Sequence, residues 1–117
     1  MSTIHISGIA VPRLSFGLGS LMKWAPGHAY PLPTDSSAEV LQAIDAGDLY
    51  TNNDSCADAL RRHNLKRSEI VLSLKLNTYA SLGCRGRQHM IESVNKEIER
   101  FGLEGYVDVL QLHFPPR

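Results

Sequence analysis

The stretch IVLSLKLNTYASLGCRGRQHMIESVNKEIERFGLEGYVDVLQLHF, residues 70–114, decides the fold, because it predicts a strand, a helix and a second strand in turn. Residues 70–76 form a nearly continuous apolar run, which is typical of a parallel strand covered on both faces. Apolar residues follow helical spacing over residues 87–101. A further apolar run, residues 107–113, ends before two prolines that cannot donate to a strand ladder. The pattern predicts an α/β fold with a parallel sheet.

Upstream of this unit, residues 4–20 alternate in polarity around Gly8, which predicts a small hairpin followed by a glycine-rich strand end. The proline-rich segment 22–33 predicts a loop. A helix is expected from Ser36, after a cap at Thr34 or Asp35, to a glycine stop at residue 47.

A second helix is expected to begin near Ser55, capped by Asp54 or by Ser55 itself. Only the polar loop DLYTNND separates it from the preceding helix, so one strand of the alternating order is missing between the two helices. We expect one domain over residues 1–117, built as a βα alternation with that strand absent.

Composition favours a neutral small molecule as the partner. The 117 residues include 12 basic and 12 acidic residues, and no basic cluster carries interleaved aromatics, which argues against nucleic acid and anionic membranes. No stretch approaches the roughly 20 apolar residues of a membrane span, and the N-terminus does not resemble a signal peptide. We therefore expect a soluble, cytoplasmic protein.

Cysteine and histidine spacing does not predict a metal site. Cys56 and Cys84 do not form a CxxC pair, so free, reduced thiols are favoured over a disulfide or a zinc site. The five histidines do not form a pair at i, i+4 with an acid nearby.

Two residues are candidates for chemistry because ligands of parallel βα folds meet the carboxyl ends of the strands. Lys75 lies near the end of one predicted strand and His113 ends another. Lys75 is either functional or an edge residue that snorkels to water, and His113 alone suits a structural histidine. Tyr50, in the loop DLYTNND, would by itself be an ordinary surface aromatic.

Together the three suggest acid catalysis at a carbonyl group. A tyrosine hydroxyl, with an ordinary pKa near 10, donates a proton poorly at neutral pH unless a cation stabilises its phenolate. Lys75 is a suitable cation, and His113 is suited to orient a carbonyl oxygen. Proton donation to that oxygen assists hydride addition at carbon, an effect on the order of 10²–10⁴ in rate.

The sequence resembles the aldo-keto reductase family, whose members are NADPH-dependent (β/α)₈ barrels that reduce aldehydes and ketones. The likeness lies in five stretches that follow the family's order: LSFGLGS, AEVLQAIDAG, LYTNND with the SCADALRR helix, IVLSLKL and YVDVLQLHFP. It implies the N-terminal half of a TIM barrel preceded by a β-hairpin.

The resemblance implies Tyr50 as the proton donor, Lys75 as the cation that supports it, and His113 as the group that orients the substrate carbonyl. Trp24 and Phe114 are candidates for the apolar wall of the pocket, with simple packing as the alternative. The glycine-rich strand end, at Gly19 and Ser20, is the candidate for contact with NADPH.

Two departures from the family pattern bear on activity. The family has a strand ending in Asp-Thr-Ala where Gly47 here runs into Asp48, so the strand and the aspartate that pairs with the lysine look deleted. Asp48 lies closer to Tyr50 than the family's aspartate does, and Asp45 falls in the predicted helix, so we assign neither to that role. The chain also stops near the fourth strand, before the part that holds most of the NADPH in the family.

These observations leave several functions open. The first is a truncated aldo-keto reductase, with a fungal secondary-metabolite pathway as its setting. The second is an inactive fragment or pseudoenzyme that self-associates through exposed strand edges. The third is an acid-base enzyme without a nucleotide, catalysing an isomerisation or a dehydration. For the isolated chain we expect little or no NADPH-dependent activity.

Overall fold

A computed structural model describes residues 3–12, 16–17, 40–102 and 105–114 of the chain. Strands β1 (Thr3–Ile6) and β2 (Ile9–Pro12) form an antiparallel hairpin. Its turn, at Ser7 and Gly8, has two positive φ angles of 48° and 81°, as a tight two-residue hairpin turn requires. The predicted N-terminal hairpin is therefore confirmed.

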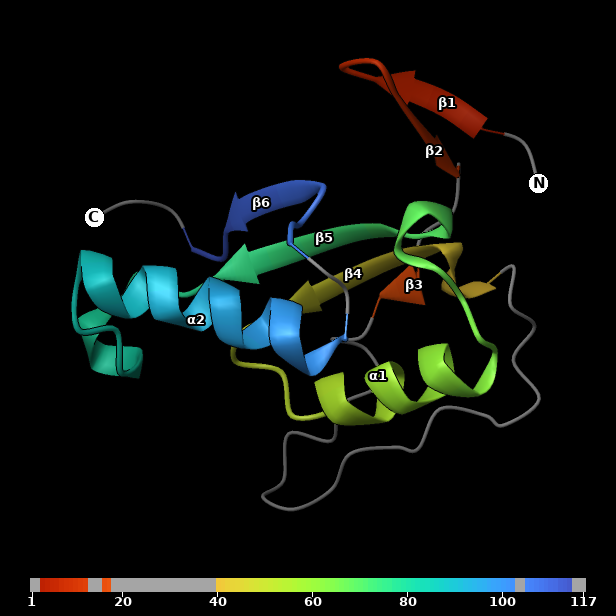
Figure 1. The fold of residues 1–117 in the computed structure, drawn as a ribbon. Helices are drawn as coiled ribbons and strands as arrows, with labels where there is room; N and C mark the ends of the chain where they lie inside the picture. Colours follow the sequence, from red (N-terminus) through yellow and green to blue (C-terminus); the bar gives the residue numbers. More distant parts are fainter. Residues whose placement is uncertain (1–2, 13–15, 18–39, 103–104, 115–117) are drawn as a thin grey trace.

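A four-stranded parallel sheet follows, in the order β3, β4, β5, β6 (Figure 1). Its strands and the α-helices and 3₁₀ turns between them are β3 (Phe16–Gly17), η2 (Val40–Gln42), β4 (Ala43–Gly47), α1 (Asn53–Arg62), η3 (Arg67–Glu69), β5 (Val71–Leu76), η4 (Ala80–Leu82), α2 (Arg87–Arg100) and β6 (Val109–Leu112). The strand order in space equals the order along the chain, as in a barrel wall. The sheet does not close in the described part of the chain, and the predicted α/β fold is confirmed.

Helices α1 and α2 lie on the same side of this sheet (Figure 1). Strand β5 alternates half-buried and buried residues, because successive side chains of a strand point to opposite faces. Its buried side chains, Leu72, Leu74 and Leu76, are at most 3% exposed. Burying a leucine fully contributes about 1.5–3 kcal/mol, so this face supplies much of the core.

The core also contains Cys56, whose thiol is completely buried. Burial raises the pKa of this thiol to about 12, so it stays protonated at neutral pH. Cys56 and Cys84 are both free.

Strand β4 corrects the prediction of a helix over residues 36–47. Residues 43–47 pair in parallel with β5, and two of them, Ile44 and Asp45, pair with β3 on the other side. Ile44 and Ala46 are 1% and 0% exposed, so strand periodicity places both of them in the core. The helical spacing that includes Ile44 was a local signal, and pairing with two neighbouring strands overrode it. We expected one strand of the alternating order to be absent. Strand β4 takes its place in the sheet, and its residues are ones that the sequence pattern assigns to a helix.

The predicted helices after residues 53 and 87 and the strand before His113 are confirmed within a few residues. The loop predicted over residues 22–33 lies outside the described residues. Helix α2 covers the predicted segment, and Gly102 follows it with a φ of 64°, the left-handed conformation of a helix stop. Helix α1 begins at Asn53, and its cap is Asn52 rather than Asp54 or Ser55. No helix in the part of the chain that the structure describes has the length and apolar character to cross a membrane.

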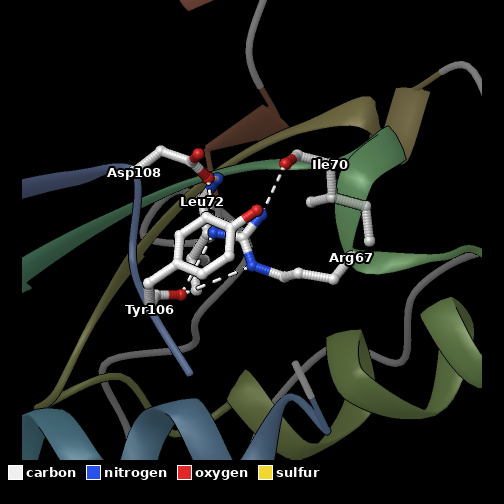
Figure 2. Close-up of polar contacts among 5 residues, drawn as sticks. All are labelled: Arg67, Ile70, Leu72, Tyr106 and Asp108. Carbon is white, nitrogen blue, oxygen red and sulfur yellow. Dashed lines mark hydrogen bonds and ion pairs between the residues drawn. The ribbon is translucent and has the colours of Figure 1, made fainter. Parts of the chain in front are cut away.

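A polar cluster joins the amino ends of β5 and β6 (Figure 2). The guanidinium of Arg67 donates to Asp108 Oδ2 at 2.7 Å, to the carbonyl of Ile70 at 2.7 Å and to that of Tyr106 at 3.1 Å. The Tyr106 ring lies over the guanidinium, 3.7 Å from its central carbon. Asp108 Oδ2 also accepts from the amide of Leu72 at 2.7 Å. These contacts bind the starts of the two strands to each other.

Candidate active site

Tyr50, Lys75 and His113 come together at the carboxyl ends of three adjacent strands. Tyr50 lies in the turn after β4, Lys75 is the fifth residue of β5, and His113 directly follows β6. The Tyr50 and His113 rings meet edge to face, with centroids 5.5 Å apart. Lys75 Nζ lies 5.8 Å from the centroid of the Tyr50 ring. The candidates found in separate sequence segments therefore face one shared region.

A tight turn positions Tyr50. Its amide donates to the carbonyl of Gly47 at 3.0 Å, and its ring packs against the α-carbon of that glycine. A Cβ added at Gly47 would lie 3.0 Å from the ring, closer than ordinary van der Waals contact. Gly47 is therefore needed for close approach of the tyrosine ring to the end of β4.

Asp45 binds Lys75, which corrects our earlier interpretation of this aspartate. Lys75 Nζ donates to Asp45 Oδ1 at 2.5 Å. The sequence pattern places Asp45 in a helix, but it lies on β4, and its side chain is on the same face of the sheet as that of Lys75. Their side chains are 32% and 21% exposed, so the pair is only partly shielded from water.

Sequence reasoning missed Asp45, although a signal for it was present. Strand β4 reads AIDAG, in which a single charged residue stands among small and apolar ones. A half-buried lysine such as Lys75 needs a partner, and an acid on a neighbouring strand satisfies that need. Recognising β4 as a strand would have supplied that partner.

Asp48 occupies a separate position and joins the loops after β4 and β5. Both of its carboxylate oxygens accept from the amide of Asn77, at 3.0 and 3.1 Å, and its own amide donates to the carbonyl of Lys75 at 3.0 Å. Burial raises the pKa of Asp48, while the Asn77 amide and nearby His113 act in the opposite direction. This carboxylate is therefore occupied by the backbone of the next loop.

His113 is held by its backbone and by stacked rings. Its amide donates to the carbonyl of Leu76 at 3.0 Å. The imidazole stacks on Phe114, with centroids 4.5 Å apart and an interplanar angle of 5°, and Phe114 stacks in turn on Tyr79. Nδ1 of His113 is buried and has no hydrogen-bond partner among the described residues. Leaving a buried polar atom unpaired costs about 1–3 kcal/mol.

Phe114 thus contacts His113. A residue in the wall of a pocket beside His113 would make the same contact. Trp24, Gly19 and Ser20, the other candidates for the pocket and for the cofactor, lie outside the described residues. The described site combines a hydroxyl, a cation held by a carboxylate, and an imidazole. Such a set can donate a proton to an oxygen, stabilise the resulting phenolate and orient the group that receives the proton.

Comparison with known families gives a match to the family model described as "Aldo/keto reductase family", over residues 38–117. The chain is 25% identical to versiconal hemiacetal acetate reductase of Aspergillus parasiticus, over 96% of the chain and 40% of that protein. It is also 25% identical to glycerol 2-dehydrogenase (NADP(+)) of Saccharomyces cerevisiae, over 95% of the chain and 32% of that protein. The chain thus spans well under half the length of these relatives.

Among solved structures, the chain is similar to an aldo/keto reductase from Brucella melitensis. The TM-score is 0.63 at 18% sequence identity, and the similarity covers 97% of the chain and 41% of that protein. At this identity the likeness concerns the fold. It relates the open four-stranded sheet to part of a larger barrel.

Proposed function

The chain belongs to the aldo/keto reductase family, and from this premise we propose that it carries the proton-donating part of a site for NADPH-dependent reduction of an aldehyde or ketone. The observation that supports this most is the Asp45–Lys75 pair beside Tyr50 and His113. In the family that the sequence resembles, an aspartate pairs with the lysine, and we propose Asp45 for that role. The carboxylate of Asp45 holds the lysine side chain in place.

In the proposed reaction the Tyr50 hydroxyl donates its proton to the carbonyl oxygen of the substrate. Lys75 stabilises the phenolate that Tyr50 then becomes, and Asp45 keeps the lysine in position. His113, whose ring lies against that of Tyr50, orients the carbonyl oxygen. Solvent returns a proton to Tyr50 after the alcohol leaves.

NADPH, when bound, supplies the hydride that the carbonyl carbon takes up. The described residues fit that chemistry on the carbonyl side, since the proton donor, its cation and the imidazole converge there. Gly19 and Ser20 are the proposed contacts to the cofactor, and Trp24 and Phe114 the proposed apolar wall. The Aspergillus relative is named as a reductase of versiconal hemiacetal acetate, and we extend this to a carbonyl substrate in a fungal secondary-metabolite pathway, in the cytoplasm.

The rate expected of the isolated chain is low but should depend on Tyr50. One reason for expecting little or no activity was an unpaired Lys75, and its contact with Asp45 removes that reason. The second reason is the short span of the chain relative to known reductases, and it remains. The chain spans 40% of its reductase relative and 32% of its dehydrogenase relative.

The test is transfer of deuterium to a simple aldehyde from NADPH deuterated at the transferable position of the nicotinamide, with the alcohol measured by mass spectrometry. Replacing Tyr50→Phe should lower the rate by a factor on the order of 10²–10⁴. Tyr106→Phe, at the opposite end of the sheet, serves as the matched control and should leave the rate unchanged. Product formation equal in the wild type and Tyr50→Phe would contradict the proposal.

A second candidate function, a non-catalytic association module, is favoured by the outer strand β6. Leu110 and Leu112 are 53% and 55% exposed. Their partners on β5, Leu74 and Leu76, are buried on the face that the helices cover. An outer strand with exposed leucines invites pairing with another copy of the chain. Absence of Tyr50-dependent product, together with a dimer or larger species by sedimentation equilibrium, would favour this candidate.

A further inference from the structure

Glu97 is a buried carboxylate that the proposed reaction does not use. It lies on α2, and only 2% of its surface is exposed. Carboxylates are rarely buried to this extent without partners, because the charged form loses its hydration. Burial accordingly raises the pKa of Glu97, against the opposing influence of Arg100 and Asn53.

The principal partner of Glu97 is Asn53, which is fully buried and is the first residue of α1. Asn53 Nδ2 donates to Glu97 Oε2 at 3.0 Å and to the carbonyl of Gly47 at 2.8 Å. An amide nitrogen has two hydrogens in a fixed plane, so these two bonds use its full donor capacity. Arg100 Nε lies farther from the same carboxylate oxygen, at 3.5 Å.

The Gly47 carbonyl connects this pair to the candidate active site. It also accepts from the amide of Tyr50 at 3.0 Å, which closes the turn after β4. The Tyr50 ring rests on the α-carbon of the same glycine. A displacement of Gly47 would therefore move the backbone of Tyr50 and the surface that supports its ring.

We propose that Glu97 is a positioning residue that acts through Asn53 to hold the Gly47 turn, and thereby sets the Tyr50 ring beside Lys75 and His113. The carboxylate fixes one hydrogen of the Asn53 amide, and the planar amide then directs the other hydrogen at the Gly47 carbonyl. The catalytic meaning of this arrangement rests on the proposed function of Tyr50, but the geometry can be tested without it.

A purely structural role makes a different prediction. Asn53 begins α1 and Glu97 lies on α2, so their bond also joins the two helices. If joining helices were its whole effect, losing the bond would change stability and leave the Tyr50 ring where it is. The position of the ring therefore discriminates between the two roles.

The experiment compares Glu97→Leu and Glu97→Gln by NMR in protein with labelled tyrosines, with Tyr50 assigned from Tyr50→Phe. In Glu97→Leu, cross-peaks from the Tyr50 ring to the Gly47 α-protons and the His113 ring should weaken at least about two-fold, since misplacements of about 1 Å are the relevant scale. Glu97→Gln retains an acceptor oxygen and should restore them. Glu99→Leu, at an exposed glutamate of the same helix, is the matched control and should leave them unchanged.

A measurement on the unmodified chain keeps the test valid if Glu97→Leu does not fold. Both amide hydrogens of the Asn53 side chain should exchange with solvent at least about ten-fold more slowly than those of exposed Asn64, because both are bonded and buried. Folded Glu97→Leu with unchanged Tyr50 cross-peaks would overturn the proposal, as would rapid exchange at Asn53. Neither readout requires NADPH. If the proposed reductase function failed, the Tyr50 cross-peaks and the Asn53 exchange rates would still test the role of Glu97.

Discussion

The two ends of the parallel sheet use similar residues in opposite ways. At the amino end, Arg67 and Asp108 are 11% and 10% exposed, and they bond to each other and to the adjoining backbone. At the carboxyl end, Lys75 and Asp45 form a pair that still reaches water, and His113 retains a buried nitrogen without a partner in the described structure. The polar side chains at the amino end are nearly buried and bonded to one another, whereas those at the carboxyl end are partly exposed or lack a described partner.

Under the proposed function, this difference corresponds to separate tasks for the two ends. Barrel proteins built from parallel strands keep their chemistry at the carboxyl ends, while residues at the amino ends serve stability. In this chain Figure 2 shows the amino-end cluster as a closed set of bonds around Arg67. Under the proposed function the carboxyl end receives a substrate, and the partly exposed Lys75–Asp45 pair suits that task better than the nearly buried contacts of Arg67 do.

The largest effect is expected at the amino end. Replacing Arg67→Met should lower the free energy of unfolding by about 3–5 kcal/mol, because it leaves the nearly buried carboxylate of Asp108 without its cation. Urea unfolding followed by circular dichroism measures this change. The matched control is Arg62→Met, which breaks the exposed pair with Asp58 on α1 and should cost only about 0.3–0.5 kcal/mol. Equal effects of the two substitutions would break the comparison between buried and exposed pairs.

A smaller effect on stability is expected for the ion pair of Lys75 and Asp45 at the carboxyl end. A double-mutant cycle with Asp45→Asn and Lys75→Met should give a coupling energy of roughly 1 kcal/mol, because both side chains remain partly hydrated. A second cycle, with Asp48→Asn and Lys75→Met, should give a coupling near zero, since the Asp48 oxygens are bonded to the Asn77 amide. A larger coupling for Asp48 than for Asp45 would show that Lys75 has the other aspartate as its partner.

The smallest effect concerns the pH dependence of stability. Burial raises the pKa of Asp48 above its usual 3.8, so the folded chain binds more protons at this site than the unfolded chain does. Its contribution to stability is therefore greatest below the unfolded pKa, and it declines as pH rises through the folded pKa. The advantage of the wild type over Asp48→Asn in urea unfolding should shrink from pH 4.5 to pH 7. An advantage that grows over this range would contradict a carboxyl group penalised by burial.

Prediction from the sequence succeeded where a signal was local and long. Strand β5 and helix α2 appeared within a few residues of the expected places, because their apolar patterns persist over several residues. Lys75 and His113 were found from their places near the ends of predicted strands, and Tyr50 joined them through the chemistry of the three side chains and the family resemblance. It was the parallel arrangement of those strands that turned three separate positions into one candidate site.

Strand β4 was the failure, and its cause is physical. Five residues are too few to separate strand from helix by periodicity, and Ile44 suited both patterns. The wrong assignment had a functional consequence, because it removed Asp45 from consideration. Asp45 and Lys75 are 30 residues apart in sequence, so their contact depends on the register between β4 and β5.

The sequence by itself determined that the chain has βα character, which family it resembles, and which tyrosine, lysine and histidine to consider. These follow from side-chain patterns that each segment carries regardless of its neighbours. Only the tertiary structure decided that Ala43–Gly47 is a strand, that Asp45 holds Lys75, and that Glu97 reaches the turn of Tyr50 through Asn53. Those contacts arise from strand pairing and helix packing, whose energies come from segments that meet only in the folded chain.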